Sequence, residues 1–220
     1  DWSIIIGSFV PALLWGVAFA NIVRGVKLDE HHEYVGGFFE LLNPYALLGG
    51  LVTLSVFLVH GAVFVALKTT GDIRERAQEM AIKVGLLAAV LAVLFIVWTG
   101  VVQAQLVVWV LGALAALAFL GALAATRAKR DGWAFIGSAV AIVGVVTMLF
   151  AGLFPDVLPS TINAAYSLTV ENASSTPYTL KIMTWVAVIF TPVVLAYQSW
   201  TYWVFSKRIS VKNIPDDVSA

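Results

Sequence analysis

Residues 81–125 read AIKVGLLAAVLAVLFIVWTGVVQAQLVVWVLGALAALAFLGALAA, and this stretch decides the fold. Lys83 is its only charged residue. The run is roughly twice as long as the ~20 apolar residues that one membrane-spanning helix needs. We therefore predict two spanning helices, residues 81–99 and 104–125, joined by a tight hairpin with Gly100 at the turn. Backbone amides inside lipid must be paired and β-type alternation is absent, which leaves helices rather than a barrel.

The composition extends this prediction to the whole chain. Hydrophobic residues make up 60% of the 220 positions, charged residues make up 12%, and the mean hydropathy is +0.93. A soluble domain is about a quarter charged, so lipid is the solvent that suits this composition. Four further stretches are long and apolar enough to span: 3–23, 45–67, 132–154 and 182–205. The predicted fold is one all-α transmembrane domain over residues 1–220, a polytopic bundle of about six helices.

Composition also excludes some functions and points to where the helices pack. The net charge of zero gives no basic field for nucleic acid. The absence of cysteine excludes disulfides, thiolate metal sites and cysteine nucleophiles. The first apolar run has no basic region before it, unlike a secretory signal. Gly49–Gly50 and the Ala-rich run 111–125 supply small residues for close helix contact.

Basic residues predict the orientation. Alternating the six spans puts ten of the thirteen Lys and Arg on one side of the membrane: Lys68, Arg74, Arg76, Lys83, Arg127, Lys129, Arg130, Lys207, Arg208 and Lys212. The other side has Arg24, Lys27 and Lys181. The positive-inside rule then makes both ends of the chain cytoplasmic. Residues 155–180 form a long polar outer-face loop, which we expect to pack against the outer face of the assembly, since ordered loops of this length are usually docked or functional.

His60 is the only histidine inside a predicted span. Ionisable residues at membrane depth are functional candidates, so His60 is a candidate haem ligand or proton-path residue. A hydrogen bond to a neighbouring helix is the simpler interpretation. No second histidine lies in a span to supply the other axial position of a haem iron, although a partner chain could supply one.

Two further histidines lie between the first two spans. His31 and His32 stand among Asp29, Glu30 and Glu33, a composition that can bind a metal. Adjacent histidines in a loop more often point apart into water, which we take as the first interpretation. No hydrolase, nucleotide-binding or zinc-protease motif is present, so we predict no catalytic residue and no metal site in this chain.

Five stretches resemble subunit II of the cytochrome bd-type quinol oxidases, actinobacterial members most. The longest is SLTVENASSTPYTLKIMTWVAVIFTPVVLAYQSWTYWVFSKRI at 167–209. The others are GSFVPALLWGVAFANIVRGV (7–26), LLNPYALLGGLVTLSVFLVHGAVFVALKT (41–69), RDGWAF (130–135) and FPDVLPSTI (154–162). The resemblance covers only the C-terminal portion of family members, which begin with several more helices. We therefore expect such a segment to precede Asp1, and no proton-channel residue is carried over from it.

The resemblance implies a respiratory complex of the bacterial plasma membrane. In this family the complex oxidises quinol, reduces oxygen to water and generates proton-motive force. Haem b, haem d and the quinol-oxidising loop belong to subunit I, so we expect this chain to carry no haem and to stabilise the haem-bearing subunit by lateral packing. Membrane lipid, a structural quinone and small accessory subunits are the other expected ligands and partners.

Two other functions remain open at this point. A small-molecule or ion transporter would place broken helices and binding groups at mid-membrane, and Pro11 and Pro192 are the only hints of broken helices. A membrane scaffold without a redox partner is the third possibility. Co-purification with a haem-bearing partner would separate the oxidase subunit from both.

Overall fold

The computed structural model describes residues 2–209, so Asp1 and Lys212 lie outside the described residues. Six helices in that range are long and apolar enough to cross a membrane, which confirms the predicted all-helical, multi-pass fold. They are α1 (Trp2–Arg24), α2 (Pro44–Lys68), α3 (Asp72–Gln103), α4 (Leu106–Arg127), α5 (Asp131–Leu153) and α7 (Pro177–Val204). The orientation in the membrane stays a prediction.

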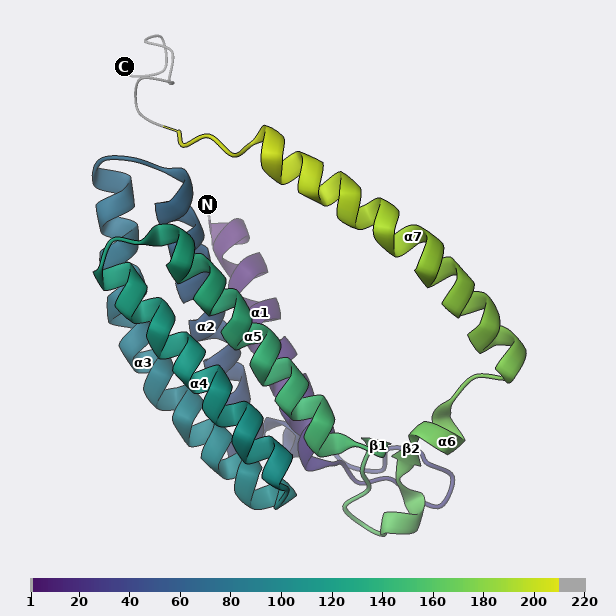
Figure 1. The fold of residues 1–220 in the computed structure, drawn as a ribbon. Helices are drawn as coiled ribbons and strands as arrows, with labels where there is room; N and C mark the ends of the chain where they lie inside the picture. Colours follow the sequence, from purple (N-terminus) through teal and green to yellow (C-terminus); the bar gives the residue numbers. More distant parts are fainter. Residues whose placement is uncertain (1, 210–220) are drawn as a thin grey trace.

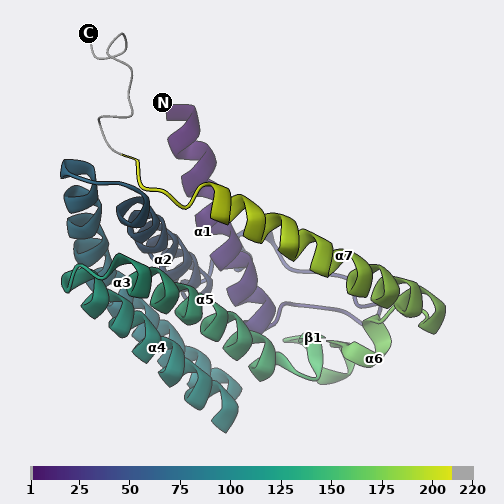
Figure 2. The same cartoon turned by 45° about the horizontal axis from the view of Figure 1, so that its top comes forward.

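Helices α2 to α5 form an up-and-down bundle (Figure 1). Each packs against the next in sequence, and α5 closes the bundle by packing against α2. Helix α1 lies along α2 and touches α5 at one edge. Helix α7 runs apart from the bundle in Figure 1, and in the view of Figure 2 its C-terminal end passes in front of α1. Its 28 residues include none that is buried.

Small residues bring the bundle helices close together. A Cβ atom built on Gly16 of α1 would lie 2.7 Å from the Cα of Gly50 on α2. A Cβ atom on Gly144 of α5 would lie 3.0 Å from the Cβ of Ala115 on the Ala-rich α4. Such short approaches are possible only because these positions carry little or no side chain. Close contacts therefore form at both of the small-residue segments that the sequence indicates.

The α3–α4 hairpin turns later than predicted. Gly100 is helical, and the chain reverses at Ala104, which adopts a left-handed conformation (φ 50°) and donates its N–H to the Gly100 carbonyl at 2.9 Å. The predicted turn at Gly100 is therefore wrong. Gly100 instead lets Trp109 of α4 approach, since a Cβ there would lie 2.6 Å from the indole ring. Gln105 completes the hairpin by donating to the Gly152 carbonyl at the end of α5.

Two chain segments form a small platform at the end of the bundle where α1 ends. Strands β1 (Asp156–Leu158) and β2 (Leu168–Thr169) pair antiparallel around the short helix η2 (Ala164–Tyr166), and α6 (Val170–Ala173) follows. The connection after α1 contains η1 (Phe38–Leu42) and lies alongside. Val26 joins the two segments: its N–H donates to the Pro159 carbonyl at 3.0 Å, and its carbonyl accepts from Thr161 at 2.9 Å.

The predicted loop 155–180 is thus a folded segment. The hydroxyl of Ser160 donates to the Leu28 carbonyl at 2.8 Å, which adds a side-chain bond to the backbone contacts with the first connection. Helix α7 begins at Pro177, earlier than the expected start at Ile182, with Thr176 as its N-cap. Whether the segment also packs against other subunits stays a prediction.

Candidate functional site

His60 lies on α2 and faces α5. Its Nδ1 atom is 2.8 Å from the Oγ atom of Ser138, and its ring stacks on Phe135 with 4.8 Å between the ring centroids. The Ser138 hydroxyl donates its single hydrogen to the Phe135 carbonyl at 2.9 Å, so His60 Nδ1 must be the donor to Ser138. His60 therefore makes the interhelical hydrogen bond that its simpler interpretation requires.

The surroundings of His60 do not by themselves form a two-ligand haem site. The buried methionine of α5, Met148, lies ten residues beyond Ser138, about 15 Å along the helix. Its sulfur packs at Gly112 of α4. Met148 is therefore not placed to complete an axial pair with His60. A haem or proton role for His60 stays a prediction.

A buried ion cluster joins three parts of the chain near the start of α5. The carboxylate of Asp131, 1% exposed, accepts from Arg74 Nε at 2.8 Å and from Arg208 at 2.9 Å, both at Oδ2. Its Oδ1 accepts from Gln78 Nε2 at 2.5 Å. We call these four residues the Asp131 cluster. Buried charges require such pairing, because an unpaired charge in low dielectric is very costly.

The Asp131 cluster was missed by reasoning from the sequence. Its other three members lie 53 to 77 residues from Asp131 in the chain, and only the structure brings them together. One local signal existed: Asp131 is an acidic residue at the first position of a spanning helix, directly after the basic residues Lys129 and Arg130. An acidic residue there interacts favourably with the helix dipole, but the position does not identify its arginine partners.

A second polar pair is buried near the other end of the bundle. The hydroxyls of Tyr45 on α2 and Thr99 on α3 are 2.8 Å apart. Thr99 donates to the Phe95 carbonyl at 2.7 Å, so Tyr45 is the donor to Thr99. The Tyr45 ring also stacks on Phe95 with 5.1 Å between centroids. This pair fixes α2 against α3, and its polar groups are satisfied within the chain.

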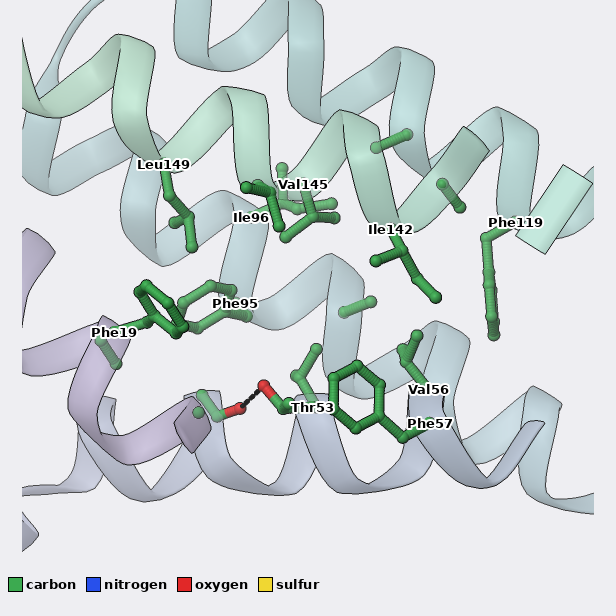
Figure 3. Close-up of a pocket in the computed structure, with 18 of the residues that line it drawn as sticks. Phe19, Thr53, Val56, Phe57, Phe95, Ile96, Phe119, Ile142, Val145 and Leu149 are labelled. Atoms are coloured by element: carbon green, nitrogen blue, oxygen red, sulfur yellow. Dashed lines mark hydrogen bonds between the residues drawn. The ribbon is translucent and has the colours of Figure 1, made fainter. Parts of the chain in front are cut away.

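An apolar cavity of about 450 Å³ lies between α1, α2, α3, α4 and α5. Phe19 and Phe95 line one end, and Phe57 and Phe119 line the other (Figure 3). The hydroxyl of Thr53, which also lines it, donates its hydrogen to the Gly49 carbonyl at 2.9 Å, so its oxygen can only accept a hydrogen bond from a ligand. The size falls within the range of roughly 300–1,000 Å³ typical of ligand pockets, and the lining suits a hydrocarbon chain.

The two histidines between α1 and α2, His31 and His32, contact different groups. His32 Nδ1 is 2.8 Å from the Tyr166 carbonyl, which adds a contact between the two connections. His31 Nε2 is 3.7 Å from the Glu30 carboxylate, and both side chains are exposed. Asp29 accepts from the backbone N–H groups of Glu33 and His31, and these bonds lower the pKa of its carboxyl group. No group of three or more metal-ligating side chains occurs in the described range 2–209.

Comparison with known proteins identifies the relatives of this chain. The family model for cytochrome bd terminal oxidase subunit II matches residues 1–205. Cytochrome bd ubiquinol oxidase subunit 2 of Bacillus subtilis is 34% identical over 97% of this chain and 64% of its own length. Cytochrome bd-I ubiquinol oxidase subunit 2 of Escherichia coli K12 is 32% identical over 97% of this chain and 66% of its own length. Probable cytochrome oxidase subunit 2 of Haemophilus influenzae is 34% identical over 92% of this chain and 63% of its own length.

Two conclusions follow from the comparisons. The chain spans slightly less than two thirds of the length of these curated relatives. The six apolar helices within residues 2–209 and the bacterial relatives make it a multi-pass protein of the bacterial inner membrane.

Proposed function

Because this chain belongs to the cytochrome bd terminal oxidase subunit II family, we propose that it forms part of the non-haem subunit of a respiratory quinol oxidase. The complex oxidises quinol, reduces oxygen to water and contributes to the proton-motive force. The match over residues 1–205 is the observation that carries this proposal. The comparisons give no support to the transporter alternative.

Haem b and haem d are assigned to the partner, subunit I. The hydrogen bond of His60 to Ser138 supports this assignment, because it occupies the Nδ1 atom of the ring within the chain. The role left for this chain is lateral packing against the haem-bearing subunit. Large apolar side chains cover its outward faces, including Trp185 and Phe190 of α7, and such faces suit lipid or neighbouring helices.

A structural quinone or lipid is the ligand class proposed for the apolar cavity. Its volume and its phenylalanine-rich lining favour a hydrocarbon tail over a polar molecule. Thr53 has no hydrogen left to donate to a quinone carbonyl, so a quinone head group would lie elsewhere. The tail would act as a packing element between α1 and α5 rather than as a reactant.

The proposed orientation places both ends of the chain in the cytoplasm. The end of the bundle at which α2 joins α3 and α4 joins α5 carries most of the basic residues, and Arg74, Asp131 and Arg208 join α3, α5 and the segment after α7 at this end. A positively charged end of this kind favours the cytoplasmic side. The platform of β1, β2 and η2 would then face outward.

Purification through an affinity tag on this chain, within its full-length subunit, tests the function. We expect a haem-bearing partner to co-purify and the preparation to consume oxygen when quinol is supplied. An untagged strain processed identically is the control for background oxidase. A preparation containing this subunit alone, with no quinol-dependent oxygen consumption, would overturn the proposal.

A further inference from the structure

A polar pocket lies where α1 ends and the two connecting segments of the platform meet. Its volume is about 320 Å³. Arg24 at the end of α1, Lys27, Tyr34 and Glu40 of the connection after α1, and Thr161 of the segment after β1 line it. The apolar cavity between α1 and α5 shares none of these residues and has no charged residue in its lining. The two spaces therefore suit different ligands.

The walls of the polar pocket are held in place by bonds within the chain. Gly25 follows α1 in a left-handed conformation (φ 87°), and its N–H donates to the Asn21 carbonyl at 2.9 Å. The Asn21 side chain donates to the Leu41 carbonyl at 2.7 Å and accepts from Asn43 at 2.9 Å. Thr161 is held by its backbone bond to the connection after α1. A pocket with fixed walls loses little conformational freedom when a ligand binds.

The lining of this pocket has an unbalanced positive charge. Its charged residues are Arg24, Lys27 and Glu40. Lys27 Nζ lies 2.7 Å from Glu40 Oε1, so these two charges balance each other. None of the ion pairs formed within residues 2–209 includes Arg24. The Arg24 guanidinium is therefore the charge that a ligand of this pocket would neutralise.

The end of α1 does not close the pocket to an anion. Carbonyl groups at a helix C-terminus carry partial negative charge. The Asn21 carbonyl accepts from the Gly25 N–H, and the Val23 carbonyl accepts from Gln103 Nε2 at 2.8 Å. These two bonds reduce the negative potential that α1 presents at the pocket.

The polar pocket lies at the depth of lipid head groups. Asn43, in its lining, is the N-cap of α2, whose 25 residues extend over about 37 Å, more than the ~30 Å of a hydrocarbon core. Helix η1, which contributes Glu40, also carries Phe38 and Phe39, 68% and 83% exposed. Apolar rings beside a charged pocket suit a ligand with a charged head and apolar tails.

We propose that this pocket binds the phosphate group of an anionic ligand, with Arg24 as its main contact. A planar guanidinium offers paired N–H donors that match two phosphate oxygens. Lys27 has two further hydrogens beyond the one that it donates to Glu40. A phospholipid head group is the source that the depth and the two phenylalanines favour, and free phosphate shares the same chemistry. The site does not depend on the proposed oxidase function.

Native mass spectrometry of the purified complex, with this subunit at full length, tests the site. Unmodified complex and variants are titrated with dioleoyl phosphatidylglycerol in the same detergent. We expect R24Q to bind one lipid fewer, with an apparent Kd for that lipid about 10- to 100-fold higher, as expected for loss of hydrogen bonds to a charged group. K181Q, which removes the charge of an exposed lysine on α7, is the matched control and should bind as the unmodified complex does.

T161E tests the pocket without changing α1. Thr161 is exposed, so the substitution should not disturb folding, and a carboxylate in the lining should repel phosphate and give the same loss as R24Q. Excess inorganic phosphate identifies the source: displacement of the lipid from the unmodified complex means that a phosphate group is sufficient, and no displacement means that the lipid tails are required. Full lipid binding by R24Q, or by T161E where R24Q does not assemble, would overturn the proposal. An equal loss in K181Q would also overturn it, because net charge alone would then explain the binding.

Discussion

Replacing Gly16 by alanine should separate α1 from α2. The added Cβ atom would lie 2.7 Å from the Cα of Gly50 and 2.5 Å from the Oγ1 of Thr53, and it would also meet the Gly49 carbonyl. Two of these three neighbours are backbone atoms, so one helix must move. Overpacking of a close-packed interior costs about 1–3 kcal/mol, and the better helix propensity of alanine offsets about 1 kcal/mol of that.

Gly61 on α2 provides the matched control. A Cβ atom there would meet nothing within 4 Å, so G61A changes helix propensity without overpacking. The free energies of unfolding of G16A and G61A should therefore differ by roughly 1–3 kcal/mol, with G16A the less stable. At about 2–4 °C for each kcal/mol, the difference in Tm should be about 5 °C.

Thermal unfolding followed by helical circular dichroism measures this difference. The two variants are compared with the unmodified subunit in the same detergent and in the same complex. G61A should melt at or slightly above the unmodified protein, and G16A should melt below it. Equal Tm values for G16A and G61A would refute the close α1–α2 contact.

Three further predictions concern single side chains and the orientation. Y45F removes the hydroxyl that donates to Thr99 and should cost about 1 kcal/mol in the free energy of unfolding, measured by denaturation in detergent; no change would mean that the pair is not formed. H60Q should leave the haem spectrum of the complex unchanged, and loss of a haem band would make His60 an iron ligand. A cysteine replacing Ser206 should react with a membrane-impermeant maleimide only in inverted membrane vesicles. A cysteine replacing Thr161 should react only in cells whose outer layers are removed and whose plasma membrane stays sealed. The reverse pattern would contradict the proposed orientation.

The spanning helices were predictable because hydropathy depends on local composition. Their ends were less predictable, because they depend on contacts and caps. Glycine is a common turn residue, which is why the sequence pointed to Gly100. In the structure the missing side chain of Gly100 instead makes room for Trp109, and the chain reverses at Ala104. The start of α7 at Pro177 did have a local signal, since Thr176 is an N-cap residue and proline suits the first helical position.

The candidate sites were predictable only where one residue carried the signal. His60 stood out as a histidine in an apolar helix, but its partner Ser138 lies 78 residues away. Arg74 and Arg208 entered the sequence argument as membrane-orienting charges, and their shared bond to Asp131 required the fold. The apolar cavity has no sequence signature, because it forms from five helices whose separation is set by side-chain packing.

A reduced-minus-oxidised visible spectrum of the complex purified through a tag on this chain tests the central claim most directly. Membership of the cytochrome bd subunit II family predicts haem b and haem d bands, together with a second, haem-bearing subunit in the preparation. A colourless preparation that contains this subunit at full yield would contradict the proposed role in a quinol oxidase.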